Sequence, residues 1–162
     1  MLHAKRIHPP SQEYELTESG RALTTFSLPS GRRSRSGARF TLRGVAYLVR
    51  THRLSGVYEL LDGDGTAFAT TDRVRRSWHR TCSGRVTPFR RTAAAGREYT
   101  MIGDDGAPAG TIRHSGHVHC EATADLPGLD LVLQVFALVV VLLRRRRRQA
   151  AAAVRPVSLP SG

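Results

Sequence analysis

A histidine-rich segment is the first candidate for chemistry, because it contains the side chains that zinc favours. His114, His117, His119 and Cys120 lie within seven residues of one another, and imidazole and thiolate groups are common zinc ligands. Side chains alternate between the two faces of a β-strand, so His117 and His119 would share one face and Cys120 would point to the other. We therefore expect an exposed histidine hairpin without bound metal, and a chelate formed by His117 and His119 is the alternative.

A second segment combines positive charge with an aromatic ring. Arg73, Arg75, Arg76 and Arg80 surround Trp78, a combination that can bind the phosphates and stack on the bases of a nucleic acid. A strand edge protected by charge against pairing with other strands explains the same residues. The strand-edge interpretation is favoured, and a nucleic-acid binder that uses these five residues is the alternative.

A third basic segment follows a long apolar run near the end of the chain. It consists of Arg144, Arg145, Arg146, Arg147 and Arg148. Adjacent arginines beside an apolar helix are typical of a segment that approaches acidic lipid, where each contributes about 1 kcal/mol close to the surface. These five arginines are the predicted lipid- or phosphate-binding residues, and the predicted partner is an anionic membrane surface.

Motifs for catalysis are absent from the sequence. It has no nucleophile elbow, no zinc-protease motif and no phosphate-binding glycine loop. The Asp62-Gly-Asp64-Gly segment does not continue as a calcium-binding loop, because the sixth and twelfth positions hold Ala67 and Arg73. We expect a protein that is not an enzyme, has no cofactor and acts on no small-molecule substrate.

Most of the chain shows the period of two that is typical of β-strands. Short alternating runs between residues 13 and 126 predict about eight to ten antiparallel strands in a sandwich or barrel. Two similar hairpins support this reading, since 58–65 and 99–106 both begin with Tyr and end with Asp-Gly. The predicted class is mainly β, with a disordered lead-in at 1–12 and a single β domain at 13–143.

The predicted C-terminal helix at 129–143 is apolar on all sides, so it must be covered by protein or by lipid. Its run from Leu131 to Leu143 is roughly 20 Å long, against about 30 Å for a bilayer core. A helix packed inside the barrel is favoured. The alternative is a single-pass membrane protein anchored by 127–146, with its C-terminal tail in the cytoplasm. Residues 144–162 are expected to form a basic, Ala-rich tail.

The order of these parts resembles the tubby-like β-barrel families, which include tubby C-terminal domains, phospholipid scramblases and LURP-one-related proteins. The resemblance rests on the hairpin at 57–65, the hairpin at 99–106 with the segment 110–113 after it, and the closing helix at 129–143. It implies a barrel of about twelve antiparallel strands around a central helix. It also implies a non-enzymatic module with a connection to membrane lipid.

Length and composition fit this reading. The 162 residues allow one domain. The 25 basic and 13 acidic residues give a net charge of +12, and all basic residues except Lys5 are arginine. Cys82 and Cys120 are too few for a disulfide scaffold, and no signal peptide opens the chain. We expect a cytoplasmic protein peripheral to the membrane, and whether the two cysteines pair is left open.

Overall fold

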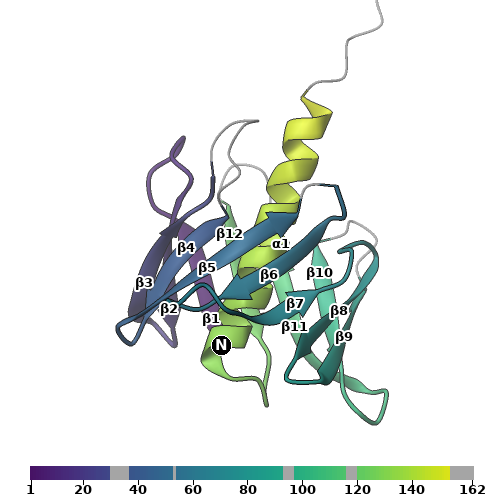
Figure 1. Cartoon of the computed structure of the whole chain (residues 1–162). Helices are drawn as coiled ribbons and strands as arrows, with labels where there is room; N and C mark the ends of the chain where they lie inside the picture. Colours follow the sequence, from purple (N-terminus) through teal and green to yellow (C-terminus); the bar gives the residue numbers. More distant parts are fainter. Residues whose placement is uncertain (30–36, 53, 93–96, 116–119, 154–162) are drawn as a thin grey trace, which may run out of the picture.

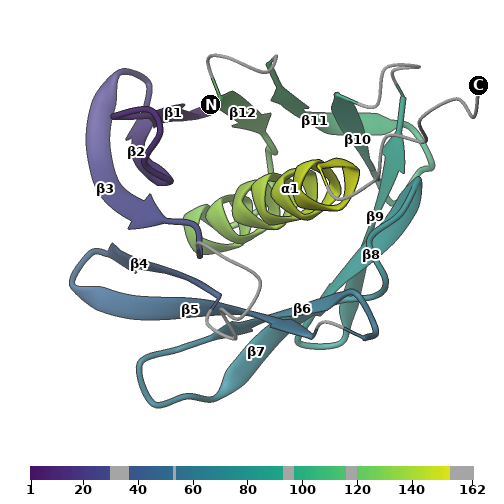
Figure 2. The same cartoon turned by 90° about the horizontal axis from the view of Figure 1, so that it is seen from above.

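The computed structural model describes residues 1–29, 37–52, 54–92, 97–115 and 120–153. Within these residues the chain forms twelve strands, which close into one antiparallel barrel, and one helix, which runs through it (Figures 1 and 2). The elements are β1 (Leu2–Arg6), β2 (Glu13–Glu18), β3 (Arg21–Ser27), β4 (Ala38–Leu42), β5 (Val45–His52), β6 (Val57–Leu61), β7 (Ala67–Thr71), β8 (Ser77–Cys82), β9 (Arg85–Arg91), β10 (Glu98–Ile102), β11 (Pro108–His114), β12 (Glu121–Asp125) and α1 (Leu131–Ala152).

The strands follow one another around the barrel in chain order, and β12 pairs with β1 to close it. Successive connections therefore lie at alternate ends. One end, here called the turn end, holds the connections β2–β3, β4–β5, β6–β7, β8–β9 and β10–β11 and the start of α1. The other, the exit end, holds the remaining strand connections and the point at which α1 leaves the barrel (Figure 1).

Alternate side chains of the strands point inward and cover the helix. In β4, for example, Ala38, Phe40 and Leu42 are buried and the residues between them are exposed. The helix contributes ten buried residues, Leu133 and Val135 through Leu143. The predicted mainly β class, with an apolar C-terminal helix inside a barrel, is confirmed. The alternative of an anchor at 127–146 is not supported, because the strands already cover its apolar side chains.

None of the described helices combines the length and the apolar character that a membrane crossing requires.

Two boundaries differ from the expectation. Residues 1–12 were expected to be disordered, but Leu2–Arg6 forms β1, which pairs with both β2 and β12. Only two residues of β1, Leu2 and Ala4, are buried. Two alternating apolar residues are too few to identify a strand from the sequence. The helix also continues to Ala152 through the arginines that were assigned to a tail, because Arg, Gln and Ala all favour helix.

Candidate anion-binding site

A pocket of about 340 Å³ lies at the exit end, where α1 leaves the barrel beside the β5–β6 and β7–β8 connections. Its lining residues are Leu54, Gly56, Tyr58, Arg73, Val74, Arg75, Arg144, Arg147, Arg148 and Ala151. Five of these are arginines and none is acidic. We call this the arginine pocket. It joins two segments that the sequence analysis treated separately, 73–80 and 144–148.

The two strand connections hold each other in place. The Gly56 N–H donates to the His52 carbonyl at 2.9 Å, and the Val74 N–H donates to the Gly56 carbonyl at 3.4 Å. Gly56 has a φ of 72°, a conformation that glycine adopts at no steric cost. Val74 is 5% exposed, whereas its neighbours Arg73 and Arg75 are exposed. Burial of this one apolar side chain therefore turns the two flanking guanidinium groups toward the pocket.

Helical periodicity divides the five consecutive arginines into two groups. Arg144, Arg147 and Arg148 are spaced so that they share one face of α1, and all three line the arginine pocket. The other two fasten the helix to the rim of the barrel. Arg145 donates through Nη1 to the Ser115 carbonyl at 2.7 Å, and Arg146 donates through Nη1 to the Leu28 carbonyl at 3.1 Å. Of the five, only the first group lines the arginine pocket.

Arg144, one of the residues that line the pocket, has a hydrogen-bond donor without an acceptor in the described part of the chain. The Nε of Arg144 is buried and has no partner among the described residues. Burial lowers the pKa of Arg144, and the charges of Arg148 and Arg91 lower it further, although Tyr99 and Tyr58 act in the opposite direction. A guanidinium group stays protonated in proteins. An anion in the pocket would therefore accept a hydrogen bond from the Nε of Arg144 and would reduce the electrostatic repulsion between the arginines.

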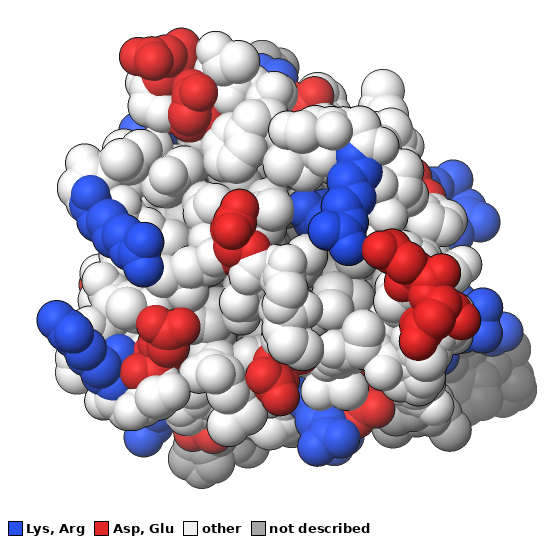
Figure 3. Space-filling model, turned by 90° about the horizontal axis from the view of Figure 1, so that it is seen from below, with Lys and Arg blue, Asp and Glu red and all other residues white. Residues whose placement is uncertain are grey.

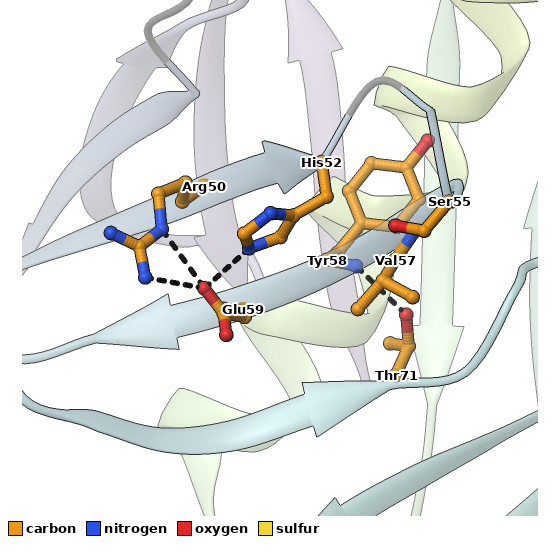
Figure 4. Close-up of polar contacts among 7 residues, drawn as sticks. All are labelled: Arg50, His52, Ser55, Val57, Tyr58, Glu59 and Thr71. Carbon is orange, nitrogen blue, oxygen red and sulfur yellow. Dashed lines mark hydrogen bonds and ion pairs between the residues drawn. The ribbon is translucent and has the colours of Figure 1, made fainter.

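Tyr58 closes the inner side of the pocket. Its side chain is 2% exposed, and burial raises the pKa of its hydroxyl although a hydrogen bond with Arg147 acts against this. The Tyr58 N–H donates to Thr71 Oγ1 at 3.1 Å, which ties β6 to β7 (Figure 4). The ring is thus held beside the helix arginines by the strand pairing.

On the opposite side of β6, three polar side chains brace the strand against β5. Glu59 accepts hydrogen bonds from Nε and Nη2 of Arg50 at 2.9 and 2.6 Å, and it lies 2.6 Å from Nε2 of His52 (Figure 4). The contacts with His52 and Arg50 lower the pKa of Glu59, while partial burial acts in the opposite direction. This cluster supports the position of the β5–β6 connection.

The structure separates the residues of the proposed nucleic-acid segment. Arg73 and Arg75 line the arginine pocket and Arg76 is exposed, but Trp78 is 0% and Arg80 is 1% exposed. The alternative of one nucleic-acid surface that uses all five residues does not fit, because β8 begins at Ser77 and its alternation turns Trp78 and Arg80 into the barrel. The favoured strand-edge interpretation does not fit either, because β8 pairs with both β7 and β9. A sequence pattern shows that side chains alternate, but it does not show which face lies inside.

The histidine candidates fall partly outside what the structure describes. His117 and His119 lie outside the described residues, whereas Cys120 is buried, the direction that strand alternation gave it. In the described part of the chain, no group of three or more His, Cys, Asp or Glu residues is placed to hold a metal. Cys82 and Cys120 are both free cysteines.

Sequence reasoning missed the five lining residues that are not arginines, among them Leu54 and Tyr58. Neither belongs to a charged segment, and no motif marks them. They reach the arginines only because β5, β6, β7 and β8 are neighbours in the barrel. Comparison with known proteins adds no further residue, since no protein-family model, curated protein or solved structure matches the chain.

Proposed function

We propose that the protein is a non-enzymatic module that binds the phosphate groups of anionic lipids through the arginine pocket. The observation that carries this proposal is a pocket whose described lining residues include five arginines and no acidic residue, with a buried Nε on Arg144 that has no partner in the described part of the chain. Guanidinium groups match the geometry of phosphate oxygens and form short, charge-assisted hydrogen bonds with them. The arginines come from both the barrel and the helix, so they surround a ligand on two sides.

The distribution of charge gives the module a preferred orientation. The turn end carries several acidic residues together with three arginines: Glu18, Asp62, Asp64, Asp104, Asp105 and Asp130, with Arg21, Arg43 and Arg85. Figure 3 shows this end, where acidic and basic side chains are interspersed without a basic cluster. An anionic surface would therefore attract the exit end more strongly than the turn end.

Leu54 favours a lipid as the source of the phosphate. Its side chain is 100% exposed, and it lines the arginine pocket. An apolar side chain beside a group of arginines can enter the interfacial region of a bilayer while the arginines contact the headgroups. An exposed leucine would not increase the affinity of the pocket for a free phosphate compound in solution.

We also infer that the protein is related to the tubby-like barrels. The support is its architecture, since a closed barrel of twelve antiparallel strands surrounds one C-terminal helix, together with the order of the two Asp-Gly hairpins. A peripheral position at the cytoplasmic face of a membrane is part of this proposal.

Vesicle co-sedimentation tests the proposed function. The double variant Arg147→Gln/Arg148→Gln removes two charges from the arginine pocket, and Arg21→Gln/Arg43→Gln removes two from the turn end as a matched control. At about 1 kcal/mol per arginine, the first variant should weaken binding to vesicles rich in phosphatidic acid by roughly 30-fold. The control should bind like the unmodified protein.

Equal weakening by the two variants, or equal binding to neutral phosphatidylcholine vesicles, would contradict the proposal. A single-stranded oligonucleotide is included as a competitor. Binding to it in the absence of any vesicle binding would favour the nucleic-acid alternative, and that binding should fall steeply with salt.

A further inference from the structure

A buried polar layer lies inside the barrel on β7, β8 and β9. Arg80 on β8 pairs in register with Thr71 on β7 and with Thr87 on β9. The exposed fractions of the three residues are 4% for Thr71, 1% for Arg80 and 7% for Thr87. A guanidinium group is thus enclosed in a barrel whose other inward side chains are mostly apolar.

The hydrogen bonds of this guanidinium group are incomplete. Nη2 of Arg80 donates to Thr87 Oγ1, while Nε and Nη1 are buried and have no partner among the described residues. The hydroxyl of Thr71 already accepts the Tyr58 N–H. Two residues earlier on β8, the indole Nε1 of Trp78 is also buried and has no partner among the described residues. This part of the interior therefore has several donors and too few acceptors.

The positive charge is also uncompensated. Among the described residues no carboxylate forms an ion pair with Arg80. Burial lowers the pKa of Arg80 and the charge of Arg85 lowers it further, whereas the Cys82 thiol, through its charge and a hydrogen bond, and the charge of the Asp130 carboxylate act in the opposite direction. Arginine does not lose its proton in proteins, and an unpaired buried charge costs several kcal/mol. A negative group inside the barrel would remove this cost.

The start of α1 lies at the turn end of the barrel, and its N-cap residue is acidic. Asp130 is the N-cap residue of α1, and its side chain makes no capping hydrogen bond. The first N–H groups of a helix lack partners within the helix and carry partial positive charge. The β8–β9 connection, which links the strands of Arg80 and Thr87, lies at the same end, and the Asp130 carboxylate acts electrostatically on Arg80.

We propose that Arg80, together with Thr87, holds a small monovalent anion of the size of chloride inside the barrel. The anion accepts the N–H groups of Arg80 that have no protein partner and neutralises the buried charge. A small ion is favoured because Arg80 is 1% exposed, which leaves no route for a bulky ligand to reach it. This internal site is independent of the arginine pocket.

Bromide tests the site directly, because it replaces chloride and scatters anomalously. Crystals of the full chain grown in bromide should show an anomalous peak within hydrogen-bonding distance of Nε or Nη1 of Arg80. A water molecule at that place, or the Asp130 carboxylate turned inward to pair with Arg80, would overturn the proposal. This experiment uses the unmodified protein, so it does not depend on a variant that folds.

Thermal unfolding gives a second readout. At constant ionic strength, the midpoint should be higher in chloride than in gluconate, because an ion that binds only the native state stabilises it. To remove any contribution of the arginine pocket, the comparison is made in the Arg147→Gln/Arg148→Gln background, in which Arg80→Met should abolish the remaining difference. A chloride effect of equal size with and without Arg80→Met in that background would overturn the proposal.

Discussion

Arginines in this chain take different roles according to the face of the element to which they belong. Arg147 and Arg148 are exposed in the arginine pocket, Arg146 is fastened to a rim carbonyl, and Arg80 is enclosed in the barrel. Their side chains are chemically identical, so only their surroundings separate a ligand-binding residue from a structural one. Predictions for single residues follow from the same surroundings.

Trp78 is expected to be a major contributor to stability. Its ring is 0% exposed and stacks on Phe89 with a centroid separation of 4.2 Å. Replacing it by alanine removes this contact and leaves a cavity, so Trp78→Ala should lower the free energy of unfolding by about 3–5 kcal/mol. Denaturant unfolding measures the loss. Ser77→Ala, at the exposed neighbouring position, is the control and should change it by less than about 0.5 kcal/mol.

The Glu59 cluster predicts a stability that depends on pH. Contacts with His52 and Arg50 lower the pKa of Glu59 below its ordinary value. A carboxylate with a lowered folded-state pKa stabilises the protein fully above its unfolded pKa, and this contribution is lost as the pH falls through the folded pKa. The difference in unfolding free energy between the native chain and Glu59→Gln should therefore be largest at neutral pH and shrink in acid.

Denaturant unfolding at a series of pH values checks this expectation. The same Glu59→Gln substitution in a chain that already carries Arg50→Gln and His52→Gln is the control, and there the dependence on pH should be weaker. A difference that stays constant from neutral to acidic pH would show that the cluster does not stabilise the fold.

At the scale of elements, α1 both fills the barrel and supplies three of the five arginines of the arginine pocket. Its residues from Leu133 to Leu143 are largely buried, and its last turns carry Arg144, Arg147 and Arg148 into the site. Core packing and ligand binding therefore share one rigid element. Because Arg145 and Arg146 hold the helix to the rim, the position of the pocket arginines is fixed relative to the strands.

Deletion of residues 127–162 is expected to prevent folding of the barrel. Ten buried apolar residues of α1 would be lost, at about 1.5–3 kcal/mol each for the larger side chains, against a usual net stability of about 5–15 kcal/mol. The truncated chain should aggregate or lose its cooperative thermal transition. Deletion of 149–162 is the control and should leave that transition intact, because 149–153 is exposed. A soluble, sharply melting 1–126 fragment would contradict the expectation.

At the scale of the whole molecule, the two ends of the barrel differ in charge. The turn end presents acidic residues such as Asp62, Asp64, Asp104 and Asp105, and the exit end presents the arginine pocket. The alternating connections of an antiparallel barrel produce this separation, since every second connection lies at the same end. A charged surface should therefore bind the molecule in one orientation.

Fluorescent labels can measure this orientation. With Cys82 and Cys120 replaced by serine and alanine, a single cysteine is introduced at Ser55 beside the arginine pocket or at Ala107 at the turn end, and each is labelled with a polarity-sensitive dye. On addition of anionic vesicles, the label at 55 should shift to the blue and become shielded from an aqueous quencher. The label at 107 should stay accessible. Equal shielding of both labels would contradict a single orientation.

Much of the architecture is present in the sequence itself. Alternation of apolar and polar residues, as in Phe40-Thr41-Leu42-Arg43, predicts strands, and the two Asp-Gly turns at 62–65 and 103–106 predict hairpins. The uninterrupted apolar run at 131–143 predicts a helix that must be covered on all sides. These features are local, because each depends on residues a few positions apart, so they can be read without knowledge of the tertiary structure.

Only the tertiary structure decided which residues meet. Arg73 and Arg148 lie 75 positions apart in the chain, and they reach one pocket because strand order and the path of α1 bring them to the same end. The burial of Trp78 and Arg80 also depends on the tertiary structure. Alternation in β8 divides its side chains between two faces, and only the pairing of the strands into a barrel determines which face points inward. Both outcomes depend on pairings between distant segments, which no short stretch of sequence specifies.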